Sequence, residues 1–262
     1  MNVVLTVGIV LVCLSALRRR PRRRDLAGLA WGLIAGIFAE VVLGGETVLH
    51  KLAPQFVMAH FLLGMVLLAT SVVLYHRSGQ PDSLDGLPAG KARALPARCL
   101  VRKGQVVAAR CMLGLTALVV VLGTVVTSTG PHAGAPGVRR FGFSLHTVAQ
   151  LHGTSVEVLL ALTVATLWSL HRSRAPAEVL RQGELLLVVL VAQAAVGYTQ
   201  YLTGDPVAVV AVHLAGATAV LVAMLIFNLS LYVRGKEVTV HTGDEARQRA
   251  PLLTERQRLT EI

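Results

Sequence analysis

Charged residues are scarce in this sequence, which excludes most classes of soluble domain. Only 15% of the 262 residues are Asp, Glu, Lys or Arg, 54% are hydrophobic, and the mean hydropathy is +0.64. Apolar runs of about 17–25 residues can cross a hydrocarbon layer of about 30 Å as helices. Backbone polar groups in lipid must be hydrogen bonded within the chain, so we expect helices rather than strands. The seven apolar segments are 3–17, 27–49, 56–76, 107–128, 146–170, 183–202 and 207–233.

Cysteine is also rare, and its placement excludes two kinds of site. The three cysteines are Cys13 in an apolar segment, Cys99 between segments and Cys111 near a segment end. No Cys-x-x-Cys motif occurs, and no cysteine lies in a predicted outer loop. We therefore expect neither a structural disulfide nor a cysteine-based metal site.

Acidic residues are few, and the net charge of +11 raises the question of a nucleic-acid partner. The distribution of the 25 Lys and Arg residues argues against one, because they gather in alternate loops. This alternation follows the positive-inside rule. It places the N-terminus outside and the C-terminus in the cytoplasm. The four positions outside the basic loops and tail are Lys51, Arg110, Arg139 and Arg140.

An internal repeat organises the chain. The segment 33–75 is a near-copy of part of the segment 185–233, and a constant offset of 153 residues aligns the two without a gap. Such self-similarity indicates repeated structural units. In each copy a glycine precedes a histidine by sixteen residues and follows an acid or amide by four. These residues are Glu40, Gly44 and His60 in one copy, and Gln193, Gly197 and His213 in the other.

We predict an all-α integral membrane protein with about seven transmembrane helices in two pseudo-repeated helical-bundle halves. Segment 107–128 has no partner in the first half, so a complete array would have eight helices, with one more before Met1. We expect the chain to be N-terminally short; a true seven-helix protein is the alternative. The predicted units are an incomplete N-terminal half (1–77), a cytoplasmic linker (78–106), a four-helix half (107–234) and a polar cytoplasmic tail (235–262).

Three histidines are candidate metal ligands. His60, His152 and His213 each lie within an apolar segment, one to two turns from its outer end. Imidazoles in lipid are costly without partners, so we expect ligation rather than packing alone. Their spacing does not suit zinc. Single histidines on separate helices suit axial ligation of a haem, with His152 and His213 as a six-coordinate pair and His60 at a position left open for a reacting porphyrin.

The sequence resembles the haem A synthase family, particularly its actinobacterial branch, over about residues 3–233. The resemblance lies in Val41–Gly45, Ala59–Phe61, Gly123–Thr127, Gly130–Gly134, Thr147–His152, and Gln193–Gly197 through His213. The resemblance implies eight helices and oxidation of a methyl group of haem O to the formyl group of haem A. It also implies that His152 and His213 ligate a b-type haem, and that His60 is the second histidine of the N-terminal, substrate-haem half and is catalytic.

The resemblance further implies a multi-pass protein of the bacterial cell membrane that serves cytochrome oxidase assembly. Expected partners are the lipid bilayer and haem O. Haem O synthase, oxidase-assembly proteins and further copies of the chain are candidate partners. Arg139 and Arg140 are candidates for pairing with haem propionates, or are solvated loop charges; His132 either gates the outer mouth or is a turn residue.

Several features depart from the family pattern. The first helix and the start of the second are missing, and with them a carboxylate and another histidine that the resemblance would imply. Glu40, Glu46 and Glu157 are either substitutes for lost polar function or tolerated polar residues. The alternative functions are a bis-His b-type cytochrome without oxygenase activity and, less favoured, a transporter, for which broken helices near mid-membrane would be expected.

Overall fold

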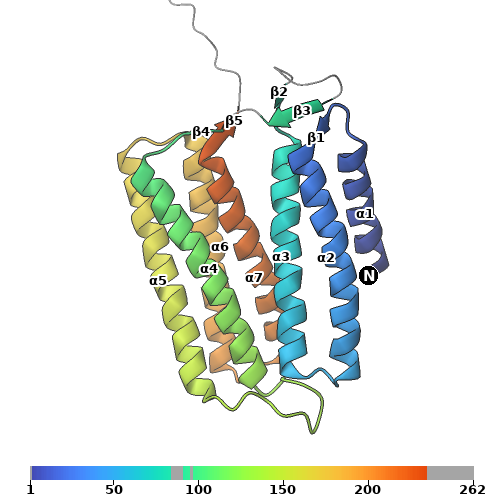
Figure 1. Ribbon diagram of the computed structural model, residues 1–262. Coiled ribbons are helices and arrows are strands. Elements are labelled where there is room, and N and C mark those ends of the chain that lie inside the picture. The colour runs from blue at the N-terminus through green and yellow to red at the C-terminus, as the bar shows by residue number, and fades with distance from the viewer. Residues whose placement is uncertain (1, 84–90, 95–96, 235–262) are drawn as a thin grey trace, which may run out of the picture.

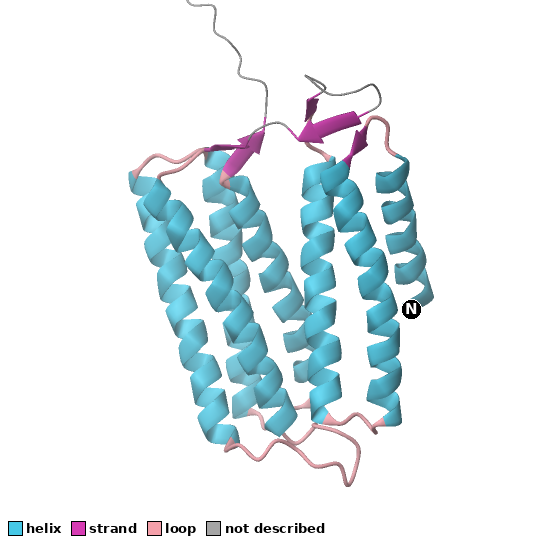
Figure 2. Ribbon diagram, in the orientation of Figure 1, coloured by secondary structure: helices cyan, strands magenta, loops and turns pink. Residues whose placement is uncertain are grey.

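The computed structural model describes residues 2–83, 91–94 and 97–234, which form a bundle of long, roughly parallel helices (Figures 1 and 2). Met1 and the predicted tail from residue 235 lie outside the described residues. In this part of the chain the helices are α1 (Asn2–Arg18), α2 (Arg24–Leu49), α3 (Pro54–Ser78), α4 (Lys103–Thr129), α5 (Leu145–Arg172), α6 (Ala177–Leu202) and α7 (Val207–Ser230).

The predicted all-α membrane fold is confirmed. Six helices, α2 to α7, are long and apolar enough to span a membrane. The first helix, α1, has 17 residues, or about 26 Å at 1.5 Å per residue. It is shorter than the other six helices, which have 24–28 residues. Each of the six runs without a break over its described length, unlike the interrupted helices expected of a transporter.

The helix boundaries reproduce the repeat predicted from the sequence. Moving α2 along the chain by the 153-residue offset gives the bounds of α6, and the start of α3 at Pro54 moves to the start of α7 at Val207. The same shift places α1 on the second part of α5. The helix bounds therefore agree with the expected pairing of segments, and α4 is the helix without a counterpart in the described part of the first half.

The turn between α2 and α3 and the turn between α6 and α7 share one backbone geometry although their residues differ. Lys51 and Leu52 have φ of 55° and 59°, and Gly204 and Asp205 have φ of 75° and 60°. The Leu52 amide donates to the Thr47 carbonyl at 2.8 Å, and the Asp205 amide donates to the equivalent Gln200 carbonyl at 2.9 Å. Positive φ is unfavourable for a bulky residue such as leucine, so helix packing rather than local preference sets this turn.

Short strands join the helices at the basic end of the bundle (Figure 2). The strands are β1 (Arg22–Arg23), β2 (Asp82–Ser83), β3 (Lys91–Ala94), β4 (Ala97–Cys99) and β5 (Tyr232–Arg234), in the sheets β1-β3-β2 and β4-β5. The segment 78–106, predicted as a linker, contains the strands β2, β3 and β4 among its described residues, and α4 begins within it at Lys103. In addition, Arg23 is buried and forms an ion pair with Asp25 at 2.7 Å, so the basic run also has a packing role.

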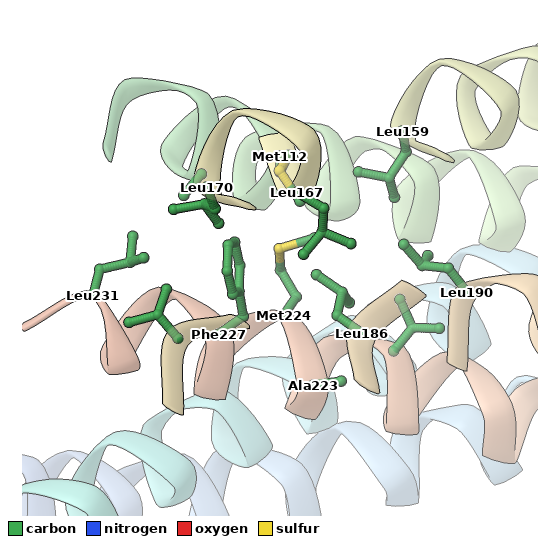
Figure 3. Close-up of a cluster of buried hydrophobic side chains, with 13 residues drawn as sticks. Met112, Leu159, Leu167, Leu170, Leu186, Leu190, Ala223, Met224, Phe227 and Leu231 are labelled. Atoms are coloured by element: carbon green, nitrogen blue, oxygen red, sulfur yellow. The ribbon is translucent and has the colours of Figure 1, made fainter. Parts of the chain in front are cut away.

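The tightest packing lies toward the same basic end. In the four-helix half, α4 to α7 enclose the largest cluster of buried apolar side chains (Figure 3). A smaller cluster joins α1, α2 and α3. The two halves meet where Met65 of α3 packs with Leu221 and Leu225 of α7. The members of the largest cluster are Ala109, Met112, Leu159, Leu167, Leu170, Val179, Leu186, Leu190, Val220, Ala223, Met224, Phe227 and Leu231.

Truncating Phe227 tests this core. Phe227 is 1% exposed, whereas Phe38 is 70% exposed. We expect Phe227→Ala to lower the free energy of unfolding by about 3–5 kcal/mol because it leaves a cavity, and Phe38→Ala to change it by less than about 0.5 kcal/mol. Denaturant titration in detergent, followed by circular dichroism, measures both. Equal losses for the two variants would contradict this assignment of the core.

Candidate functional site

His152 and His213 meet inside the four-helix half. His152 lies seven residues after the start of α5 and His213 six residues after the start of α7. Both α4 and α6 pack against α5 and against α7, so α5 and α7 face each other diagonally across the bundle. The ring centroids of the two histidines are 6.4 Å apart, with planes at 74°. The structure thus brings together the two residues that the sequence singled out as an axial pair.

Each of the three candidate histidines lies against a glycine of the preceding helix. A Cβ atom at Gly123 would lie 3.2 Å from Cε1 of His152. At Gly197 it would lie 3.0 Å from Cε1 of His213, and at Gly44 3.2 Å from Cε1 of His60. These separations are tighter than ordinary van der Waals contact. The absent side chains therefore let each imidazole lie close to the neighbouring backbone.

The residue four positions before each glycine faces Nδ1 of the same histidine. The carbonyl oxygen of Val119 lies 3.1 Å from Nδ1 of His152. A carbonyl oxygen only accepts hydrogen bonds, so Nδ1 carries the proton and Nε2 has a free lone pair, as a metal ligand requires. Gln193 Nε2 lies 3.1 Å from Nδ1 of His213 and donates to the His213 carbonyl at 2.8 Å.

This arrangement fits a haem held by two axial imidazoles. Metal–imidazole bonds are about 2 Å long, so two rings on opposite sides of one metal have centroids about 6 Å apart, close to the observed separation. Two imidazoles are too few for a closed zinc site, and the described residues contain no cluster of three or more ligating side chains. The donor set therefore agrees with the haem ligation expected from the sequence.

The helices around the histidine pair are packed less tightly than at the basic end. No residue described between 145 and 158, or between 191 and 219, is fully buried. The buried residues of α5, α6 and α7 lie from the middle of these helices toward the basic end.

His60 has a different environment in the N-terminal half. It lies six residues after the start of α3, and Oε1 of Glu40 on α2 lies 3.3 Å from its Nδ1. Within the described residues, no second histidine ring contacts His60 in the way that His213 contacts His152. His60 therefore has an acidic neighbour, and no second histidine faces it among the described residues.

The loop between α4 and α5 contacts both the α2–α3 turn and the α6–α7 turn. Nε2 of His132 lies 2.7 Å from the Asp205 carbonyl oxygen, and the Ala135 amide donates to the Lys51 carbonyl at 3.0 Å. Arg140 donates to the Pro131 carbonyl at 2.8 Å, and both Arg139 and Arg140 are exposed. The loop thus bridges the outer ends of the halves, and its two arginines are accessible there.

Sequence reasoning missed the contact between glycines and the candidate histidines. The structure places Gly44, Gly123 and Gly197 of the preceding helices against the rings. The repeat contained the signal, because Gly44 and Gly197 share one spacing to their histidines.

One further pair was not foreseen. The Tyr198 hydroxyl donates to Oε1 of Glu157 at 2.8 Å, which links α6 to α5. Both side chains are exposed on the surface of the bundle. The hydrogen bond gives Glu157 a partner within the apolar span.

Comparison with known proteins gave one match. The family model COX15-CtaA, described as cytochrome oxidase assembly protein, matches residues 2–225. No curated protein and no solved structure matched the chain. The matched region extends from α1 into α7 and includes all three candidate histidines.

Enlarging Gly197 tests the glycine contact. We expect Gly197→Val to displace the His213 ring and weaken the binding of added haem b about tenfold or more, the size of effect typical of residues that orient metal ligands. Gly114→Val in α4 is the matched control, because a Cβ there meets nothing within 4 Å. Absorption titration of the detergent-purified chain measures the affinity. Equal affinities of the two variants would contradict the proposed packing.

Proposed function

The chain belongs to the COX15-CtaA family of cytochrome oxidase assembly proteins, the haem A synthase family, and we propose that it converts haem O to haem A. The reaction oxidises a methyl group of the porphyrin to a formyl group. The observation that carries the proposal is the pair of imidazoles from α5 and α7, with ring centroids 6.4 Å apart inside an apolar bundle. Membership of the family indicates the class of reaction, and this histidine pair would hold the redox group that such a reaction needs.

The four-helix half would hold a b-type haem through His152 and His213. Bound there, the haem would supply one-electron transfer, as six-coordinate haems do. The chain contributes the position of both ligands. The Val119 carbonyl fixes the His152 tautomer, and Gly123 and Gly197 let the rings lie close to the neighbouring backbone.

The N-terminal half would bind the substrate, haem O, beside His60. No second histidine ring faces His60 among the described residues, whereas His152 and His213 face each other, so a haem bound beside His60 would have a single histidine ligand from these residues. This difference supports a division of roles, with electron transfer in one half and reaction in the other. The bridging loop carries Arg139 and Arg140 at the outer ends of both halves, where they would pair with haem propionates.

The same observations support one alternative function. The four-helix half has two histidine rings that face each other, His152 and His213, whereas no second histidine ring faces His60 among the described residues. A chain that used only the first site would be a b-type cytochrome without oxygenase activity. The two functions share the haem at His152 and His213, and differ in whether haem O is converted.

We place the basic loops in the cytoplasm. The structure gathers the strands and basic connections at one end of the bundle, and the bridging loop lies at the other (Figure 1). The positive-inside rule then makes the basic end cytoplasmic, including the exit from α7. The candidate histidines lie toward the opposite end, so haem O would bind near the outer side of a bacterial cell membrane. Haem O synthase, oxidase-assembly proteins or a second copy of this chain are the partners we would test first.

Alanine substitutions separate the enzyme from the cytochrome. We expect His152→Ala and His213→Ala each to lose the b-type haem. We expect His60→Ala to retain it, while conversion of haem O to haem A falls at least about tenfold because a metal ligand is lost. Haem extraction and chromatography after feeding haem O measure both quantities.

His171→Ala is the control, because His171 is exposed and pairs with Glu184 at 3.1 Å. It should retain the b-type haem and the full conversion of haem O. If the unaltered chain retains b-type haem but forms no haem A, the haem A synthase function is excluded and the b-type cytochrome remains. Absence of haem from the unaltered chain would exclude both functions.

A further inference from the structure

The three candidate histidines differ in the chemical group that faces Nδ1. The group is a backbone carbonyl for His152 (Val119), a neutral amide for His213 (Gln193) and a carboxylate for His60 (Glu40). All three groups come from the position four residues before the glycine that contacts the ring. The repeat therefore provides an internal comparison in which only the N-terminal site has an acid.

Glu40 lies too far from the end of α2 to be a residue of the membrane interface. It precedes the end of α2 at Leu49 by nine residues, which is about 14 Å along the helix. Glu46, in contrast, lies within the last turn of α2 and pairs with His50 at 3.4 Å, with both side chains about half exposed. An intramembrane acid is costly and marks a functional position by default. Glu46 is explained by the interface, and Glu40 is not.

The surroundings of Glu40 accommodate its carboxylate. A Cβ atom at Gly64 would lie 3.3 Å from Oε1 of Glu40. In the second copy, a Cβ at Gly216 would overlap the Gln193 amide oxygen. Each of these polar side chains therefore has a glycine opposite it on the next helix. Both Oε2 of Glu40 and Nδ1 of His60 are buried and have no aligned hydrogen-bond partner, although 3.3 Å separates Nδ1 from Oε1.

We propose that Glu40 is a positioning residue that accepts the Nδ1 proton of His60 in a hydrogen bond when His60 binds iron. A small rotation aligns the two groups, fixes the tautomer with Nε2 free, and makes the imidazole more basic, as carboxylates do for metal-bound histidines. A more basic ligand stabilises ferric over ferrous iron. A haem iron bound by His60 thus has a lower reduction potential than it would have with an amide partner. This inference rests on the proposed function.

Glu40→Gln tests the inference by giving the N-terminal site the partner of the second copy. The full chain is loaded with haem b in detergent, and the component that disappears in His60→Ala is assigned to the N-terminal site. We expect Glu40→Gln to weaken the preference of that site for ferric iron about tenfold, an upward shift of about 59 mV for a one-electron couple. The iron–histidine stretching frequency of the ferrous haem should fall as well. Redox titration and resonance Raman spectroscopy measure these two quantities.

Two matched variants complete the experiment. Glu46→Gln removes an acid from the same helix and should shift neither quantity. Gln193→Glu places the acid beside His213 and should lower the potential of the haem that depends on His152 and His213. It also tests the effect of the acid even if Glu40→Gln fails to fold.

The outcomes separate this inference from the proposed function. A His60-dependent haem whose potential and stretching frequency are the same in Glu40→Gln as in Glu46→Gln would overturn the role of Glu40 and leave the function standing. Failure of Gln193→Glu to lower the potential of its haem would likewise overturn the proposed effect of the acid. Absence of any His60-dependent haem in the unaltered chain would overturn the function, and this inference with it.

Discussion

The close approach of an imidazole to a glycine on the preceding helix is the contact on which the rest of the site depends. A methyl group at Gly44, Gly123 or Gly197 would press on a histidine ring, so these helix pairs can hold their rings this near the backbone only because a side chain is missing. The same closeness lets the residue one turn earlier reach Nδ1. The position of each ring and the group that faces its Nδ1 therefore follow from one spacing along one helix.

The fold was largely predictable from the sequence because a membrane restricts the choice of structure. Apolar runs had to be helices, the basic loops fixed their alternation, and the repeat predicted helix boundaries that the structure reproduces. The short strands of the segment 78–106 were not predicted, because Gly and Pro there indicated only a linker. The pairs β1 with β3 and β4 with β5 join residues far apart in the sequence, and local composition does not encode such contacts.

For the site, the sequence named His60, His152 and His213 but not the groups that hold them. The Val119 contact uses a backbone carbonyl, which every residue has, so no residue type announces it. The role of Glu40 needed a distance, since its spacing from His60 says nothing about how two antiparallel helices pack. The contact of His132 with Asp205 joins residues 73 positions apart and could not be read from the motif around His132.

The constant offset between the two copies has an evolutionary consequence. From the start of α2 to the last turn of α3, the chain aligns with α6 and α7 without insertion or deletion, through a turn whose backbone is the same in both. This is the pattern that duplication of a helical unit would leave, and the same offset also aligns α1 with the second part of α5. The two descendants then share one backbone, and their divergence lies in single side chains such as Glu40 and Gln193.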